Sequence, residues 1–126
     1  MQRTLALLAA CCLLTSSGCG ADSHDKIATE MISLAKQMNE KLSTIKDKQS
    51  AEAAKPELEA LATEFKQVQE REKLLAQPSA EEQQALMQKY GQEMIQTRTQ
   101  LMLTMGALEA NPEVGPVLEP VFDKMR

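Results

Sequence analysis

Cysteine and aromatic residues are scarce in this chain of 126 residues, and their scarcity excludes several kinds of protein. All three cysteines, Cys11, Cys12 and Cys19, lie within the first nineteen residues. The rest of the chain therefore has no disulfide framework, no thiolate nucleophile and no cysteine-based zinc site. The net charge of -4 at pH 7 argues against nucleic acid as a partner, because binding phosphate requires clustered Lys and Arg.

The sequence also lacks a set of residues suited to catalysis. His24 is the single histidine, so no Ser or Thr in the body of the chain has an obvious base beside it. Carboxylates are plentiful, but neighbours such as Glu81 and Glu82 do not converge in a cleft as general acid–base catalysis requires. We therefore predict a non-catalytic protein without a cofactor.

The N-terminal residues have the pattern of an export signal. The basic start Met1-Gln2-Arg3 precedes an apolar run of twelve residues, 4–15, which is followed by small residues and then Cys19. A membrane-spanning helix needs roughly 20 apolar residues, so this run is too short to span a bilayer. No later segment is apolar enough either, and we expect no transmembrane helix in the mature protein.

The segment Ser16-Ser17-Gly18-Cys19 resembles the lipobox of bacterial lipoproteins, in which the final cysteine is lipidated. It departs from the usual pattern at Ser16, where Leu is expected. The resemblance implies a signal peptide at 1–18, a lipid on Cys19 and a tether at 19–24. In such lipoproteins a residue other than Asp after the lipidated cysteine, here Gly20, permits sorting to the periplasmic side of an outer membrane where the cell has one, and the alternative is a soluble secreted or periplasmic protein.

Two other ways of processing the signal remain open. The segment Leu8-Ala9-Ala10-Cys11 fits the short lipobox pattern better, but it leaves only residues 4–10 as the apolar region. Ordinary cleavage after Ala21 would instead give a soluble secreted or periplasmic protein. Its start, Asp22-Ser23-His24, has a free amine, two amide nitrogens and an imidazole that could bind Cu(II) or Ni(II) in a square plane.

Residues 25–126 are predicted to form one all-α domain, an antiparallel three-helix bundle with a short, broken C-terminal helical segment. The first helix is expected at 25–46, because apolar residues recur there at steps of three and four. This spacing is shown by Ile27, Met31, Leu34, Met38, Leu42 and Ile45. The polar segment 46–49 is expected to be the turn that follows.

The second helix is expected to start near Ser50, or to restart at Pro56, and to end at Pro78. The capping-box sequence Ser79-Ala80-Glu81-Glu82 predicts the start of a third helix, over 80–108. The apolar positions of these two helices are Leu58, Leu61, Phe65, Val68 and Leu75, then Leu86, Tyr90, Met94, Leu101, Met105 and Leu108. Three prolines lie beyond residue 110, so any helix there is predicted to be short and broken.

A few charged residues interrupt the apolar faces of the second and third helices, and they predict an ion pair between these helices. If the second and third helices form a hairpin about Pro78, Arg98 lies opposite Glu59, and we predict an ion pair between them. Glu72 is a second polar residue of this kind. Both could also face water at the edge of a helix.

Methionine is the remaining enriched residue, with eight in the chain. Met102 and Met105 are three residues apart, a spacing that Cu(I) could use, although most of the methionines fall on apolar faces where they would fill the core. His24, Met102 and Met105 are thus the only metal candidates, and no metal site is predicted.

These observations favour a non-catalytic, lipid-tethered protein of the cell envelope that presents a helical surface to another protein or to a second copy of itself. Residues 50–58 also resemble a stretch in small bacterial lipoproteins of unassigned activity. The alternative is a periplasmic metal-binding or stress-sensing protein, or a helical chaperone. One such family carries paired Leu-Thr-x-x-Gln motifs, whereas Leu103-Thr104-Met105-Gly106-Ala107 lacks the Gln.

Overall fold

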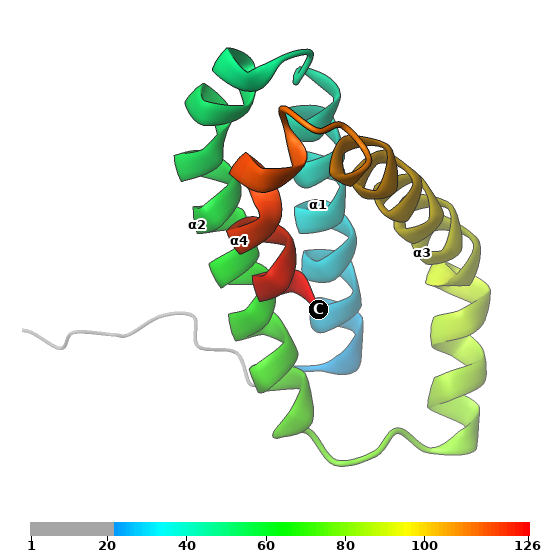
Figure 1. The fold of residues 1–126 in the computed structure, drawn as a ribbon. Coiled ribbons are helices and arrows are strands. Elements are labelled where there is room, and N and C mark those ends of the chain that lie inside the picture. Colours follow the sequence, from blue (N-terminus) through cyan, green and yellow to red (C-terminus); the bar gives the residue numbers. More distant parts are fainter. Residues whose placement is uncertain (1–21) are drawn as a thin grey trace, which may run out of the picture.

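The computed structural model describes residues 22–126 as four helices joined by short connections (Figure 1). They are α1 (His24–Ser43), α2 (Lys48–Lys73), α3 (Ala80–Glu109) and α4 (Gly115–Met125). No strand is present in this part of the chain, so the predicted all-α class is confirmed. The signal peptide, Ser16, Ser17, Gly18 and Cys19 lie outside the described residues. Within 22–126, no helix is both long enough and apolar enough to cross a membrane.

The first helix buries the face that its apolar spacing predicts. Ile27, Leu34, Met38 and Leu42 are buried on α1, and Ile45 is buried just beyond its end. The helix begins at His24, one residue earlier than predicted, because the Ser23 hydroxyl caps it by accepting a hydrogen bond from the Lys26 backbone N–H at 3.2 Å.

The second helix starts earlier than predicted. Asp47, not Ser50, is its N-cap: the Asp47 carboxylate accepts the Ser50 N–H at 2.8 Å, and the Ser50 hydroxyl accepts the Asp47 N–H at 3.0 Å. This reciprocal capping box places Lys48 and Gln49 inside α2 rather than in a turn. The helix continues through Pro56 without restarting there.

The third helix begins where its sequence predicts. The Ser79 hydroxyl accepts the Glu82 N–H at 3.2 Å, and the Glu82 carboxylate accepts the Ser79 N–H at 3.0 Å. The helix ends at Glu109, one residue beyond the predicted end. A local capping motif therefore suffices to define this start.

The prediction of a short, broken helical segment at the C-terminus is wrong, because this segment forms one continuous helix. α4 is continuous over eleven residues, including Pro120, and Pro116 lies in its first turn, where no N–H partner is needed. Asn111 turns the chain between α3 and α4, because its side-chain oxygen accepts the Glu113 N–H at 2.9 Å. The most deeply buried side chains near the C-terminus are Val114, Leu118, Val121 and Phe122, each 0% exposed. The molecule therefore has a fourth core helix where a three-helix bundle was predicted.

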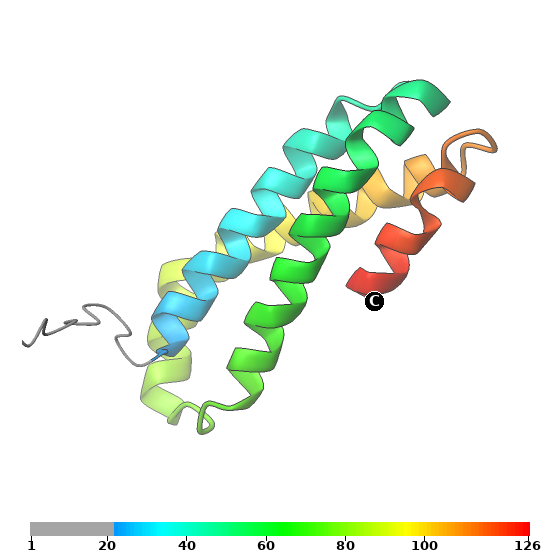
Figure 2. The same cartoon turned by 90° about the vertical axis from the view of Figure 1, so that its left-hand side faces the viewer.

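The fourth helix determines which helices are neighbours in the bundle. α1 packs against α2 and α3, and α4 packs against the same two helices from the other side (Figures 1 and 2). Within residues 22–126, α2 and α3 do not pack directly against each other. The predicted ion pair between Glu59 on α2 and Arg98 on α3 is consequently wrong, and neither residue has an ion-pair partner among the described residues.

Candidate functional site

The apolar surface of the described chain is concentrated on α3. Six large hydrophobic side chains in residues 22–126 are clearly exposed, and five of them lie on this helix. These five, between 43% and 66% exposed, are Met87, Met94, Ile95, Met102 and Leu103, which we call the α3 stripe. An isolated exposed apolar residue is ordinary, but a series along one helix marks a surface that a partner can cover.

The spacing of the α3 stripe brings four of its members together in two pairs. Met87 and Met94 are seven residues apart, as are Ile95 and Met102, so each pair returns to almost the same side of the helix after two turns. The buried side of α3 is sparsely apolar, with Leu101 its one buried large hydrophobic side chain. α3 thus contributes less to the core than its length would allow.

The length of α4 leaves part of the bundle without a fourth helix. At 1.5 Å per residue, α4 is about 16 Å long, whereas α2 is about 39 Å and α3 about 45 Å. α4 follows the C-terminal end of α3, so the N-terminal part of α3 and the C-terminal part of α2 lie beyond its reach (Figure 1). Phe65, Leu75 and Met31 are partly buried against the core.

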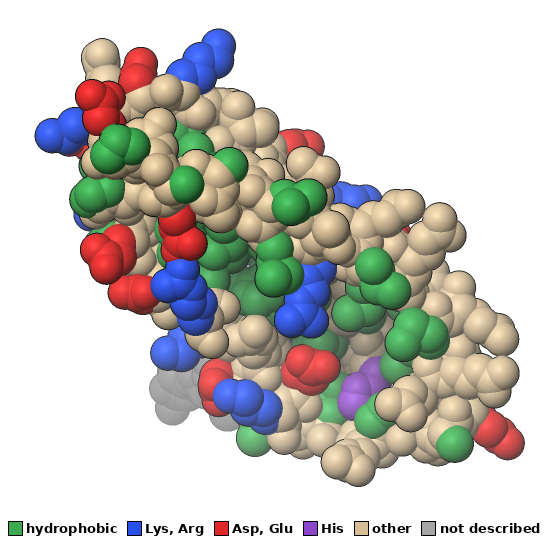
Figure 3. All heavy atoms as spheres, turned by 45° about the vertical axis from the view of Figure 1, so that its right-hand side comes forward, with side chains coloured by type: hydrophobic (Ala, Val, Ile, Leu, Met, Phe, Trp, Pro, Cys, Tyr) green, Lys and Arg blue, Asp and Glu red, His purple; other side chains and the backbone are tan. Residues whose placement is uncertain are grey.

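The space-filling view shows this side of the molecule. Hydrophobic side chains form several neighbouring patches, with basic and acidic side chains between them and a hollow among them (Figure 3). The surface is therefore suited to an elongated apolar ligand, such as the face of an amphipathic helix.

Charged residues distinguish the two sides of α3. On the side facing α1, Lys89 forms an ion pair with Asp25 at 2.8 Å, and Lys36 pairs with Glu93. The Lys89 hydrogen bond lowers the pKa of the Asp25 carboxyl below its ordinary value. Arg98 lies four residues from both Met94 and Met102, and among the described residues it forms no ion pair. A positive charge is thus left in the middle of the α3 stripe.

The metal candidates are not brought together. His24 opens α1, and its Nε2 lies 2.8 Å from the Ala76 carbonyl oxygen. Met102 is exposed on α3, whereas Met105 packs partly against the core, so their side chains face different surroundings. No group of three or more His, Cys, Asp or Glu residues suited to a metal occurs in the described part of the chain. The interpretation of most methionines as core filler holds for Met38, which is buried, and for Met31, Met105 and Met125, which pack partly against the core, and it is wrong for the exposed methionines of the α3 stripe.

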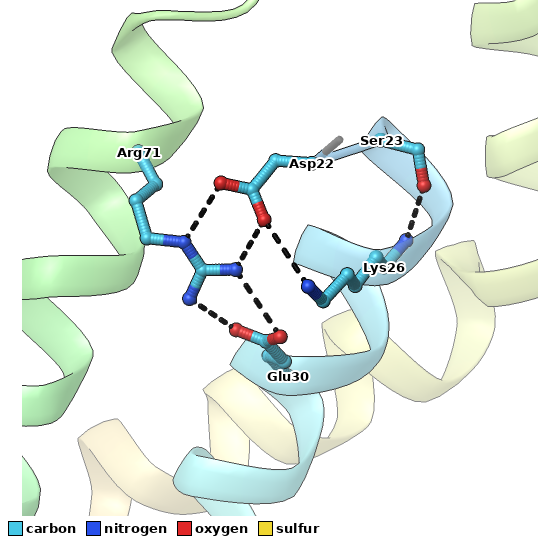
Figure 4. Close-up of polar contacts among 5 residues, drawn as sticks. All are labelled: Asp22, Ser23, Lys26, Glu30 and Arg71. Carbon is cyan, nitrogen blue, oxygen red and sulfur yellow. Dashed lines mark hydrogen bonds and ion pairs between the residues drawn. The ribbon is translucent and has the colours of Figure 1, made fainter. Parts of the chain in front are cut away.

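A charged cluster that the sequence does not reveal joins the start of the described chain to α2 (Figure 4). Arg71 donates to both carboxylate oxygens of Asp22, at 2.9 and 2.5 Å, and to Glu30 at 2.6 Å. Lys26 lies 3.4 Å from the same Asp22. These hydrogen bonds, above all from Arg71, lower the pKa of Asp22 to about 2 and raise the pKa of Arg71. Because Asp22 and Arg71 are 49 residues apart, no local sequence pattern could connect them.

Comparison with known proteins gives the chain no relatives. No model of a protein family matches it, and no curated protein and no solved structure is significantly similar to it. The α3 stripe and the Arg71 cluster are therefore interpreted from their own geometry.

Proposed function

We propose that this protein is a non-catalytic lipoprotein of the bacterial cell envelope, tethered to a membrane through Cys19, whose helical bundle presents the α3 stripe to a partner protein. The lipobox-like segment 16–19 supports the tether, and the exposed methionines of α3 support the binding surface. In this proposal the long helices form an antiparallel bundle, as expected for amphipathic helices joined by short connections.

The observation that carries the proposal is the exposure of five large apolar side chains along one helix. Methionine is flexible and polarisable, and methionine-rich surfaces adapt to the shape of a bound helix. The stripe repeats after seven residues, from Met87 to Met94 and from Ile95 to Met102, and a seven-residue spacing of anchors is typical of a helix that docks against another helix. The partner surface is thus expected to be an amphipathic helix.

Arg98 favours a partner that carries a negative charge at the matching position. A partner with a carboxylate opposite Arg98 would pair with it, whereas a purely apolar partner would desolvate the guanidinium without compensation. Two copies of this chain that paired symmetrically about Arg98 would bring two Arg98 side chains together. Like charges in contact oppose association, so a different protein is favoured over self-association.

Site-specific photo-crosslinking in the native envelope tests the surface. A photoreactive amino acid replaces Met102 in one variant, and in the control it replaces Gln100, which is exposed on the opposite side of α3. We expect a discrete cross-linked band from position 102 that is absent from position 100 and that the additional Arg98→Glu substitution weakens. Equal cross-linking at both positions would contradict the proposed surface. A diffuse smear from position 102 would point instead to a chaperone that holds unfolded chains.

The tether is tested separately, by the intact mass of the protein purified from its own membranes. We expect the mass of residues 19–126 plus acyl chains, and loss of membrane association in a Cys19→Ala variant. An unmodified chain that starts at Asp22 would contradict the tether and would make Cu(II) binding at Asp22-Ser23-His24 the next property to measure.

A further inference from the structure

The described chain begins in a residue that is fixed to the bundle. Asp22 receives two hydrogen bonds from Arg71, and the same guanidinium also donates to Glu30 (Figure 4). A bidentate guanidinium–carboxylate pair holds both position and orientation, unlike a single contact. The point at which the chain leaves the bundle toward Cys19 is therefore set by α2.

The end of α2 lies at the same place. Arg71 is followed one helical turn later by Leu74, the C-cap residue of α2, which is 86% exposed and is the most exposed large hydrophobic side chain of residues 22–126. The adjoining connection to α3 contacts the start of α1, because His24 Nε2 lies 2.8 Å from the Ala76 carbonyl oxygen. Asp22 and Leu74 thus belong to one end of the molecule.

We propose that this end rests on the lipid bilayer and that Leu74 inserts into the bilayer interface, with the Arg71 cluster fixing the orientation. The inference rests on the proposed lipid tether at Cys19. Only three residue steps separate Cys19 from Asp22, so the chain between them spans at most about 10 Å. A lipid at Cys19 therefore keeps this end of the bundle beside the membrane surface.

The charges at this end indicate which part of the bilayer is contacted. Arg71 and Lys26 are paired with Asp22, and Lys73 is paired with Glu70 at 2.8 Å, so the end offers few unpaired cations to anionic headgroups. Leu74 is left as the group that gains from leaving water. The contact is consequently apolar, and it should depend little on the content of anionic lipid or on salt.

A fluorescent probe at Leu74 tests the contact. Because the body has no cysteine and Cys19 is acylated, a Leu74→Cys substitution supplies a single free thiol for an environment-sensitive dye. The matched control is Thr44→Cys, which is exposed at the C-cap of α1, just before the start of α2, whereas Leu74 caps the far end of this helix of about 39 Å. Both lipidated proteins are reconstituted in phosphatidylethanolamine vesicles, with or without phosphatidylglycerol, and recovered by flotation.

We expect several-fold stronger quenching by nitroxide-labelled lipids at position 74 than at position 44, and no change with phosphatidylglycerol. An added Arg71→Met substitution removes the hydrogen bonds but keeps an unbranched side chain. It should leave flotation intact and reduce the quenching at position 74. Circular dichroism verifies that each variant remains helical.

The possible failures separate the two proposals. Acylated protein that floats, but whose probe at position 74 is no better quenched than the one at position 44, would overturn the Leu74 contact and leave the tether standing. Unchanged quenching in the Arg71→Met variant would refute the orienting role of the cluster. Absence of acyl chains in the intact mass would refute the tether, and the inference with it.

Discussion

Replacing Leu118 by Ala tests whether α4 is part of the core, since the sequence pattern had assigned it only to a broken tail. Leu118 is 0% exposed and lies among Val114, Val121 and Phe122, which are equally buried. Buried Leu-to-Ala substitutions cost about 2–5 kcal/mol, because transfer free energy is lost and a cavity remains. The total stability of a domain this size is about 5–15 kcal/mol, so the loss is a large fraction of it.

Urea unfolding followed by circular dichroism measures this loss. With an m-value of about 1.5 kcal/mol/M, a loss of about 3 kcal/mol lowers the midpoint by about 2 M. The control is the same substitution at Leu103, which is 66% exposed and should change stability by less than about 0.5 kcal/mol. Equal effects of Leu118→Ala and Leu103→Ala would refute the packing of α4 and restore a three-helix core.

Three further predictions concern the turn before α4, a helix cap and the charged cluster. In Gly115→Ala the new Cβ would lie 2.6 Å from the Glu109 carbonyl oxygen, so we expect the free energy of unfolding to fall by about 1–3 kcal/mol in the same urea assay. In the control, Gly106→Ala, the new Cβ meets nothing within 4 Å, so we expect the free energy of unfolding to rise by about 0.5–1 kcal/mol. Ser79→Ala removes the cap of α3 and should cost about 0.5–2 kcal/mol, seen as a lower midpoint, whereas no loss would mean that the cap is redundant. Because the pKa of Asp22 is lowered to about 2, its pairing with Arg71 stabilises the fold fully above about pH 4, and the stabilisation is lost as the pH falls through about 2. The Tm difference between wild type and Arg71→Met should therefore be largest at pH 7 and much smaller at pH 2, and a difference independent of pH would contradict the ion pair.

The features that the sequence predicts well are those carried by residues close together in the chain. Ser79 and Glu82 define the start of α3 because both halves of the capping box lie within one turn. The apolar face of α1 is equally local, since residues three and four apart share a side of a helix. Asp47 and Ser50 form a capping box of the same kind, which the polar sequence around them had concealed.

α4 could not be predicted in this way, because prolines argue against a helix on local grounds. Pro116 costs little in the first turn, where N–H groups have no helical partner, whereas Pro120 removes a hydrogen bond in the middle of α4. Burial of Leu118, Val121 and Phe122 against other helices offsets that loss, and it depends on contacts far along the chain. The predicted Glu59–Arg98 pair failed for the same reason, since it assumed that α2 and α3 pack directly.

The shortness of α4 connects the two proposed surfaces. α4 covers the end of the bundle where α3 finishes, so the uncovered half is the one that contains the C-terminal end of α2 and the start of α3. Asp22 and Leu74 lie at that same end, beside the proposed membrane contact. Met87 is only seven residues into α3, a rise of about 10 Å, so the first anchor of the α3 stripe lies near the proposed membrane contact. A partner that covers the stripe from Met87 onward is therefore expected to be bound to the same membrane, since a protein free in solution would have to enter this narrow space.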